Sequence, residues 1–307
     1  MTDPVARIAD AVLYEGYILW PYRRSAVKNQ QRWTFGGVYP PRHAQRHPDD
    51  PSHRQTEVWL ERSGDVDVTV RFLHVVERAL FDRAGNSVDE LEVDGKRYLA
   101  WDEATERQVP AAAGRSEIFI GGGCDRESLD GGAEIVRSWR ELRGVVDVRI
   151  SRADDAFRVR VRIENTTPWD GETRADALRQ TFCSTHAVLR TAKGAFVSAT
   201  EAGGENHGLW PVLVGDEGAR DTMLAAPIIL GDFPQIAPES PGDLFDATEI
   251  DQLLVLNVLA LTPQEQDEMR ATDPRAREIL DRCASLSPEQ LMRLHGAIRD
   301  FRPAVRE

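Results

Sequence analysis

Residues 145–163, VVDVRISRADDAFRVRVRI, contain the clearest structural pattern in the chain. Val146, Val148 and Ile150 alternate with polar residues, and the turn-rich stretch RADDA follows them. The alternation then resumes, with arginines between the apolar residues Phe157, Val159, Val161 and Ile163. Because successive side chains of a strand point to opposite faces, each run has one apolar and one polar face. The stretch therefore predicts a β-hairpin that buries one face and exposes the other.

Other parts of the chain show similar strand-like patterns. They are QTEVWLER (55–62), DVDVTVRFLHVV (65–76), RQTFCSTHAVLR (179–190) and GAFVSAT (194–200). Several strands at this spacing favour an antiparallel sandwich or barrel over a parallel α/β sheet. Between them, residues 42–54 are expected to form a polar, solvated loop that contains three histidines. Residues 115–134 are expected to form a short strand followed by a glycine-rich loop.

After residue 240 the apolar pattern changes to a helical period. FDATEIDQLLVLNVLAL (245–261) predicts a helix that begins at Asp246 or Thr248, with acidic residues in its first turn. Later helix starts combine a capping residue with a following proline: Thr262–Pro263 with Glu265, Asp273–Pro274, and Ser287–Pro288 with Gln290. The C-terminal quarter is therefore expected to be helical.

Together the patterns predict an α+β protein. Its N-terminal two-thirds would be an antiparallel β-sandwich or a barrel-like structure. We expect a β-rich domain at residues 1–240 and a helical C-terminal region at residues 241–307 that packs on it.

The composition excludes some classes of function. The 307 residues carry a formal net charge of −13, so the chain is not expected to bind nucleic acid, where phosphate neutralisation dominates affinity. No run reaches the roughly 18 apolar residues of a membrane span, and the N-terminus has no secretory signal pattern. Three widely spaced cysteines do not suggest a disulfide framework. We expect a cytoplasmic protein that does not contact membranes.

Residues 13–40, LYEGYILWPYRRSAVKNQQRWTFGGVYP, combine aromatic and basic side chains at the highest density in the chain. The candidate binding residues in this stretch are Tyr14, Glu15, Tyr17, Tyr22, Arg23, Lys28, Asn29, Arg32 and Trp33. Aromatic residues beside arginine are typical anchors of protein interfaces. Alternatively, the stretch is a strand and loop that close the core, with the cations at its rim. Both interpretations hold if it packs inside the protein against the acidic residues of 232–251, in which case charge reversal at Arg23 would destabilise the fold.

The stretch from residue 232 to residue 251 is rich in carboxylates. Its acidic residues are Asp232, Glu239, Asp243, Asp246, Glu249 and Asp251. Such residues can cap a helix and favour its dipole, form a partner surface, or bind a cation and act as general acid and base. We add four of them to the candidate binding residues: Asp243, Asp246, Glu249 and Asp251.

No catalytic signature appears in the sequence. Cys183 and His186 form a C-x-x-H pair, but residues three apart on a strand point to opposite faces, and no second pair completes a tetrahedral set. The glycine-rich stretch around Cys124 lacks the ends of a phosphate-binding loop. We therefore expect no metal site, no cofactor and no catalytic residue.

Three stretches together carry a family resemblance. They are YEGYILWPYRRSAVKNQQRWTFGGVYP (14–40), WPVLVG (210–215) and PIILGDFPQIAPESPGDLFDATEIDQLL (227–254). The chain resembles an uncharacterised, mainly actinobacterial protein family whose genes are associated with nickel–iron hydrogenase clusters. The resemblance covers most of the chain except residues 80–145 and brings no catalytic residues with it. It implies an accessory or assembly factor for a hydrogenase.

The leading hypothesis is a non-catalytic accessory or assembly protein that binds a nickel–iron hydrogenase subunit or a maturation partner. The alternative is a metal-dependent hydrolase that uses the carboxylates of residues 232–251. A third hypothesis, a structural subunit of a larger complex, predicts a stable oligomer. The sequence itself does not indicate an oligomeric state.

Overall fold

The hairpin predicted at residues 145–163 is present. β10 (Leu142–Ala153) pairs antiparallel with β11 (Ala156–Asn165), and a two-residue turn joins them. Asp154 in this turn has a φ of 52°, a left-handed conformation that aspartate tolerates better than most residues. Val148 pairs with Val161, and both side chains are buried. The computed structural model describes residues 3–30, 32–62, 65–236, 244–246 and 251–287.

The hairpin belongs to a five-stranded antiparallel sheet. Its order is β13 (Ala195–Phe196), β1 (His53–Glu61), β11, β10 and β7 (Gly114–Ile120). β11, the strand that carries the alternating arginines, pairs with β1 on one side and with β10 on the other. It is therefore a central strand of the sheet. Its valines point to the inner face of the sheet, where they are buried.

A second sheet has eight strands and is organised around β2 (Asp67–Phe81). Its main path is β14 (Trp210–Leu213), β15 (Thr222–Ala226), β12 (Cys183–Arg190), β2, β9 (Glu134–Trp139) and β8 (Gly123–Ser128). Two further strands pair with β2: β3 (Ser87–Val88) and β6 (Trp101–Ala111). A separate two-stranded sheet consists of β4 (Glu90–Val93) and β5 (Lys96–Leu99).

The two large sheets form a sandwich. Their inner faces share one hydrophobic cluster that includes Leu60 of β1, Val70 of β2 and Val146 of β10. The rings of Phe72 and Phe182 stack within it, 4.6 Å apart at their centroids. Each sheet ends in edge strands, β13 and β7 in one and β14 and β8 in the other, so the sandwich prediction is confirmed and the barrel alternative is not.

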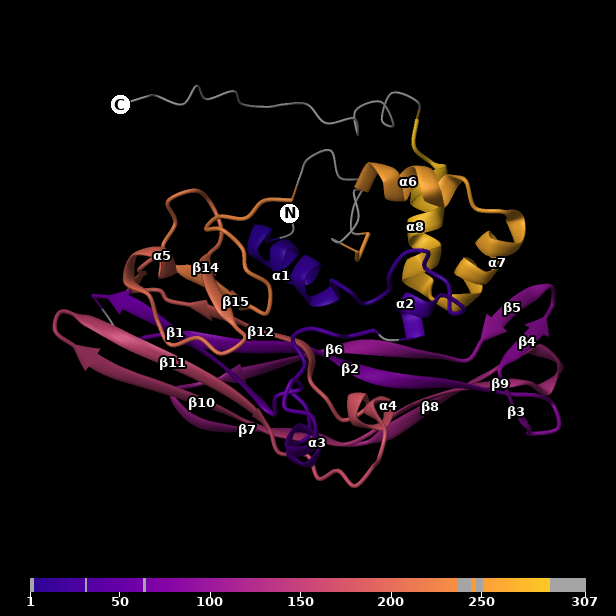
Figure 1. Ribbon diagram of the computed structural model, residues 1–307, viewed down its shortest axis with the longest axis horizontal. Coiled ribbons are helices and arrows are strands. Elements are labelled where there is room, and N and C mark those ends of the chain that lie inside the picture. The colour runs from indigo at the N-terminus through magenta and orange to yellow at the C-terminus, as the bar shows by residue number, and fades with distance from the viewer. Residues whose placement is uncertain (1–2, 31, 63–64, 237–243, 247–250, 288–307) are drawn as a thin grey trace.

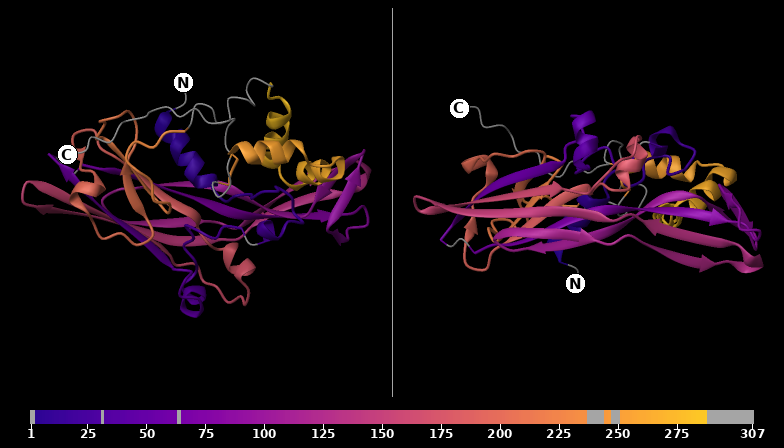
Figure 2. Two further views of the ribbon diagram at one scale, coloured as in Figure 1. Left: turned by 45° about the horizontal axis from the view of Figure 1, so that its top comes forward. Right: turned by 90° about the horizontal axis from the view of Figure 1, so that it is seen from below.

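Helices cover the sandwich. They are α1 (Pro4–Tyr14), α2 (Val27–Gln30), α3 (Pro41–Arg46), α4 (Arg174–Leu178), α5 (Ala199–Ala202), α6 (Asp251–Leu259), α7 (Pro263–Thr272) and α8 (Pro274–Ala284), with a 3-10 turn at Asp130–Gly132. α1 and α6–α8 lie along one side of the strands, and α3 and α4 lie toward the other (Figure 1). Figure 2 shows α6–α8 gathered over one end of the long strands. None of the helices in the described ranges is long and apolar enough to cross a membrane.

The C-terminal helices share a core with the sheet. One hydrophobic cluster contains Leu73 of β2, Trp101 of β6, Val255 of α6 and Ile279 of α8. The predicted α+β class, with a helical region after a β-rich one, is therefore confirmed. The predicted domain boundary at 240/241 falls at residues that the structure does not describe.

The helix starts predicted at Thr262 and Asp273 are present. The one predicted at Asp246 is not shown there, since that residue has no helical assignment and its carboxylate accepts from the Trp20 N–H. Thr262 forms a full capping box with Glu265, and Pro263 is at the first helical position of α7. Asp273 caps α8 by accepting a hydrogen bond from the backbone N–H of Arg275. The start expected at Thr248 and the helix expected after Ser287 lie outside the described residues.

Several predictions of irregular structure were wrong. Residues 42–54, expected to be a loop, include most of α3 and the start of β1. His43 is buried there and stacks on Tyr39 with ring centroids 5.0 Å apart, so it is not solvated. Within the stretch expected to be a glycine-rich loop, Gly123–Ser128 form the edge strand β8. The strand expected at 194–200 is only two residues long before α5 begins.

Candidate functional site

The aromatic–arginine stretch, residues 13–40, is largely internal. Tyr17, Tyr22, Trp33 and Tyr39 are all buried, and between α1 and α2 the chain is irregular. The expectation of a strand in this part was therefore wrong, although the expected contribution to the core is present. Because their rings pack in the cluster shared with α6–α8, these aromatic side chains are not available at the surface for a partner.

This stretch pairs with the acidic region, as expected, at residues 244–246. The Tyr22 hydroxyl donates to the Leu244 carbonyl at 2.6 Å. The backbone N–H of Trp20 donates to the buried Asp246 carboxylate at 3.0 Å, and Lys28 Nζ lies 3.8 Å from the same carboxylate. Asp243 and Glu249 lie outside the described residues, and of Asp251 the structure describes only the backbone at the start of α6.

Other candidate residues hold the stretch in its irregular conformation. Asn29 is buried, and its side-chain amide bonds both the N–H and the carbonyl of Leu19, at 2.8 and 2.7 Å. Glu15 is half-buried at the end of α1. Arg23 pairs with Glu265 of α7 at 3.0 Å, whereas the expected partner was the stretch 232–251.

A buried polar network joins the stretch to α8. Asp273, 2% exposed, accepts from the Tyr17 hydroxyl at 2.7 Å and from Trp101 Nε1 at 3.3 Å. Arg32 donates to the Tyr17 carbonyl at 3.1 Å and to the Asp102 carbonyl. Its guanidinium carbon lies 3.6 Å from the Trp101 ring centroid and 4.2 Å from that of Trp33.

Burial sets the protonation of this network. It raises the pKa of Tyr17 well above its ordinary value, and the Asp273 carboxylate raises it further. Burial lowers the pKa of Arg32 to about 10, so this side chain is still a cation at neutral pH. The network is therefore an internal scaffold of fixed charges.

The described acidic residues of 232–251 have separate structural roles. Asp232 accepts hydrogen bonds from the Leu213 N–H at 2.8 Å and from the Ser198 hydroxyl, which ties the segment after β15 to β14 and α5. Asp246 is bonded to the stretch 13–40, as described above. Within the described ranges, no group of three or more His, Cys, Asp or Glu residues is arranged to hold a metal ion.

Cys183 and His186, the C-x-x-H pair, lie on β12 and are both fully buried. The register of β12 against β2 shifts between them, and Ser184 has a φ of 49°, so this strand carries a bulge. Burial raises the pKa of Cys183 to about 12 and lowers that of His186 to about 3. At neutral pH Cys183 is therefore a protonated thiol and His186 a neutral imidazole, and both lie in the core.

Two buried histidines, His74 and His186, are expected to make the folded protein less stable at acidic pH. The ordinary pKa of a histidine is 6.5. Burial and the nearby charge of Arg107 lower the pKa of His74 to about 4. Burial and the nearby charge of Arg71 lower the pKa of His186 to about 3. Below pH 6.5 the unfolded chain binds protons that the folded protein excludes, so stability falls as the pH falls. Each histidine is expected to cost about 2 kcal/mol of unfolding free energy between pH 6.5 and 5.0.

Urea unfolding of His186→Gln at pH 7.5 and 5.0 measures this effect. Whatever its stability at pH 7.5, the variant should lose about 2 kcal/mol less than the native sequence on acidification. His207→Gln, at an exposed histidine, serves as the control for the exchange of histidine for glutamine. An unchanged pH dependence in His186→Gln would show that His186 does not titrate as a buried neutral group.

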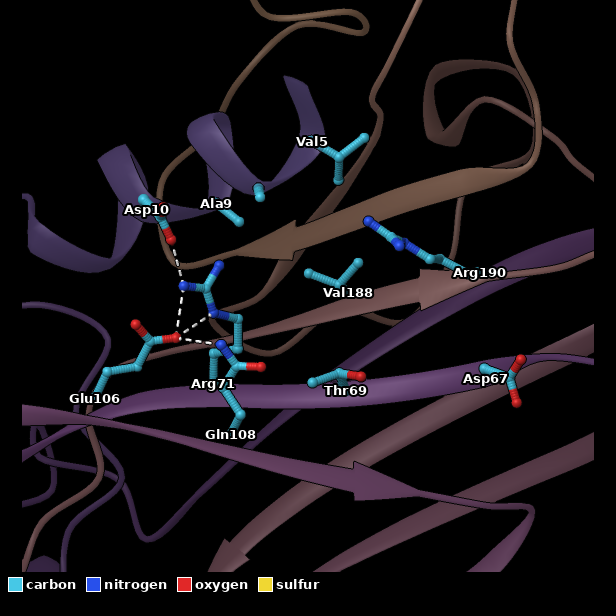
Figure 3. A pocket seen from close by; sticks show the side chains of 11 residues that line it. Val5, Ala9, Asp10, Asp67, Thr69, Arg71, Glu106, Gln108, Val188 and Arg190 are labelled. Atoms are coloured by element: carbon cyan, nitrogen blue, oxygen red, sulfur yellow. Dashed lines mark hydrogen bonds and ion pairs between the residues drawn. The ribbon is translucent and has the colours of Figure 1, made fainter. Parts of the chain in front are cut away.

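A cavity of about 380 Å³ lies beneath α1 (Figure 3). Arg71 of β2 occupies one side of it and bonds Asp10 of α1 and Glu106 of β6, which also accepts from Gln108. The Arg71 Nε–Glu106 distance is 2.9 Å. This arginine is buried and bonded to carboxylates of both α1 and β6, so it holds α1 on the sheet.

α6 presents an apolar face that sequence reasoning missed. Leu254, Val255 and Val258 are buried in the cluster shared with α8. The opposite side carries three exposed leucines: Leu253 at 50%, Leu256 at 46% and Leu259 at 38% exposure. Residues three apart on a helix are neighbours, so these leucines form one stripe, here named the α6 leucine face. The signal was the sequence DQLLVLNVL, which is too apolar all round for a helix with one solvated side.

No family model matches the chain, and no curated protein matches it.

Proposed function

We propose that the protein is a non-catalytic accessory protein that binds another protein through the α6 leucine face. The observation that carries this proposal is the exposure of Leu253, Leu256 and Leu259 on a helix whose other side is already packed. Apolar side chains at this spacing on a helix are what a hydrophobic groove of a partner recognises. Contiguous exposed apolar surface of this kind is typical of interaction sites.

The surroundings of α6 favour a preformed binding surface. The buried side of α6 packs in a hydrophobic cluster that it shares with the stretch 13–40 and with α8. A helix that is fixed before binding loses little conformational entropy when a partner docks. The buried aromatic candidates of residues 13–40 thus act indirectly, by packing in the cluster that holds the buried side of α6.

The partner expected from the family resemblance is a nickel–iron hydrogenase subunit or a maturation factor, and the expected compartment is the cytoplasm. All three cysteines are free, two of them buried, which suits a reducing compartment. The chain has a formal net charge of −13, so its electric field would speed association with a partner that presents a basic surface.

Affinity purification from a native host tests this proposal. The tagged protein should recover a hydrogenase subunit or maturation factor under mild conditions. The double variant Leu253→Ser/Leu256→Ser should bind this partner at least about tenfold more weakly, which corresponds to a loss of about 1.4 kcal/mol of binding free energy. Because both leucines are exposed, the double variant should unfold within about 1 kcal/mol of the native protein.

Ile229→Ser is the matched control, because Ile229 is exposed and apolar but lies outside α6. It should bind as the native protein does. Recovery of no hydrogenase component would refute the partner. Equal recovery with the double variant would refute the α6 leucine face. Light scattering on both proteins detects self-association, since loss of a native oligomer in the double variant would assign the face to a second copy of the chain.

The hydrolase alternative stays a prediction. It requires stoichiometric metal in the purified protein that is lost on replacing Asp243 and Asp246. Asp246 is already bonded to the Trp20 N–H and lies 3.8 Å from Lys28, so its replacement would also loosen the stretch 13–40. A metal measurement must therefore be accompanied by a measurement of unfolding.

A further inference from the structure

A second cavity, separate from the α6 leucine face, lies where the stretch 13–40 meets the sheet. Its volume is about 550 Å³. Residues 24–33, β2, β3, the start of β6 and α4 all contribute to its walls. Two buried tryptophans, Trp33 and Trp101, line it together with four arginines. The arginines are Arg24, Arg32, Arg78 and Arg179.

Three of the four arginines have carboxylate partners. Arg24 pairs with Asp89 at 3.3 Å and Arg78 with Glu103 at 2.8 Å. Arg179 pairs with Glu77 at 3.2 Å and with Asp102 at 3.4 Å. Every carboxylate that lines the cavity is therefore already engaged by an arginine.

Arg32 is the exception within the part of the chain that the structure describes. It is 5% exposed and has no carboxylate within ion-pair distance there. Its two hydrogen bonds go to backbone carbonyls, which leaves three of the five N–H donors of a guanidinium without a described acceptor. A buried cation of this kind is costly unless a charge of opposite sign compensates it.

Other donors at the cavity also lack acceptors among the described residues. Trp33 Nε1 and Arg179 Nε are buried and make no hydrogen bond. Both residues line the same cavity as Arg32. The cavity thus combines a buried positive charge, residues with spare N–H donors and aromatic walls, while the carboxylates that line it are paired with arginines.

We propose that this cavity binds a small oxyanion, a carboxylate or a phosphate group, through Arg32 and Arg179. The planar guanidinium matches the paired oxygens of either group. Each guanidinium of Arg32 and Arg179 is held in place by neighbours, so the donors are oriented before the ligand arrives. The Asp273 and Asp102 carboxylates favour the charged form of Arg32 from beyond ion-pair distance. The ligand would add a negative charge and acceptors within hydrogen-bond reach of its guanidinium.

Fluorescence titration tests the proposal, because Trp33 and Trp101 line the site. The probes are succinate and inorganic phosphate, each compared with chloride at the same ionic strength. We expect a saturable change in tryptophan fluorescence and a rise in the melting temperature with at least one of them. Succinate alone identifies a carboxylate site, phosphate alone a phosphate site, and no saturable response to either refutes the proposal.

Two variants locate the site. Arg179→Gln, at a partly exposed position, should raise the half-saturating concentration by about tenfold to a hundredfold, which is the usual effect of losing a charged hydrogen bond. Arg32→Lys keeps the positive charge but loses the paired N–H donors of the guanidinium, so it should raise the half-saturating concentration by a similar factor. Arg126→Gln, at an exposed arginine of β8, is the control and should titrate as the native protein does. Native affinity in both cavity variants would refute the assignment even if Arg32→Lys proved less stable.

Discussion

Replacing Asp273 by alanine is expected to lower the unfolding free energy by about 3–5 kcal/mol. The carboxylate is buried and accepts from the Tyr17 hydroxyl, from Trp101 Nε1 and from the Arg275 N–H. Alanine leaves the two side-chain donors buried without an acceptor, at about 1–3 kcal/mol each. It also removes the cap of α8, worth about 1 kcal/mol.

Two further variants divide this effect. Asp273→Ser restores the cap but not the contacts with Tyr17 and Trp101, so it should recover about 1 kcal/mol. Asp281→Ala removes an exposed carboxylate from the same helix and should change stability by less than about 0.5 kcal/mol. Urea unfolding followed by tryptophan fluorescence measures all three. A loss below about 1 kcal/mol in Asp273→Ala would mean that the network does not hold α8 to the stretch 13–40.

Arg78→Ala is expected to cost about 3–5 kcal/mol as well. Arg78 of β2 is buried and donates to the Leu99 carbonyl at 3.0 Å, to Glu103 at 2.8 Å and to the Thr272 carbonyl at 2.6 Å. Thr272 is the last residue of α7, where unpaired carbonyls give the helix its negative end. One guanidinium therefore ties the central strand to both the β5 end and the end of α7.

The control for Arg78 is Arg126→Ala. Arg126 lies on an edge strand of the same sheet and pairs with Glu134 at 2.8 Å, but both side chains are exposed. Exposed pairs contribute about 0–1 kcal/mol, so this variant should remain near native stability. Arg78→Lys tests geometry, since a point charge cannot reach all the acceptors and should recover less than half of the loss. Equal midpoints for Arg78→Ala and Arg126→Ala would contradict the role given to Arg78.

Local sequence signals predicted the elements that depend on local physics. The caps at Thr262 and Asp273 are local in the chain, and the hairpin at 145–163 is set by alternation and by its turn. The same cap-and-proline signal at Asp3–Pro4 begins α1, where the side chain of Asp3 accepts from the Val5 N–H. This helix could therefore have been predicted from the sequence and was missed.

The site could be predicted only in outline. The composition of residues 13–40 indicated an important segment that pairs with the acidic region, which holds for Asp246. It did not show that Arg23 pairs with Glu265 or that Tyr17 bonds Asp273, because such pairs are set by how distant elements pack. The β8 strand was missed for a similar reason, since its glycine-rich, charged sequence has little strand propensity and is held by pairing with β9.

The hydrogen bond between Tyr17 and Asp273 joins residues 256 positions apart. At a synthesis rate of about 5–20 residues per second, tens of seconds separate the emergence of the two partners from a ribosome. During that interval α6–α8 do not yet exist, so the aromatic rings of residues 13–40 cannot pack against them and are exposed to solvent. Nascent chains should therefore need a holding chaperone until α8 is made, and a fragment that stops before α6 should aggregate.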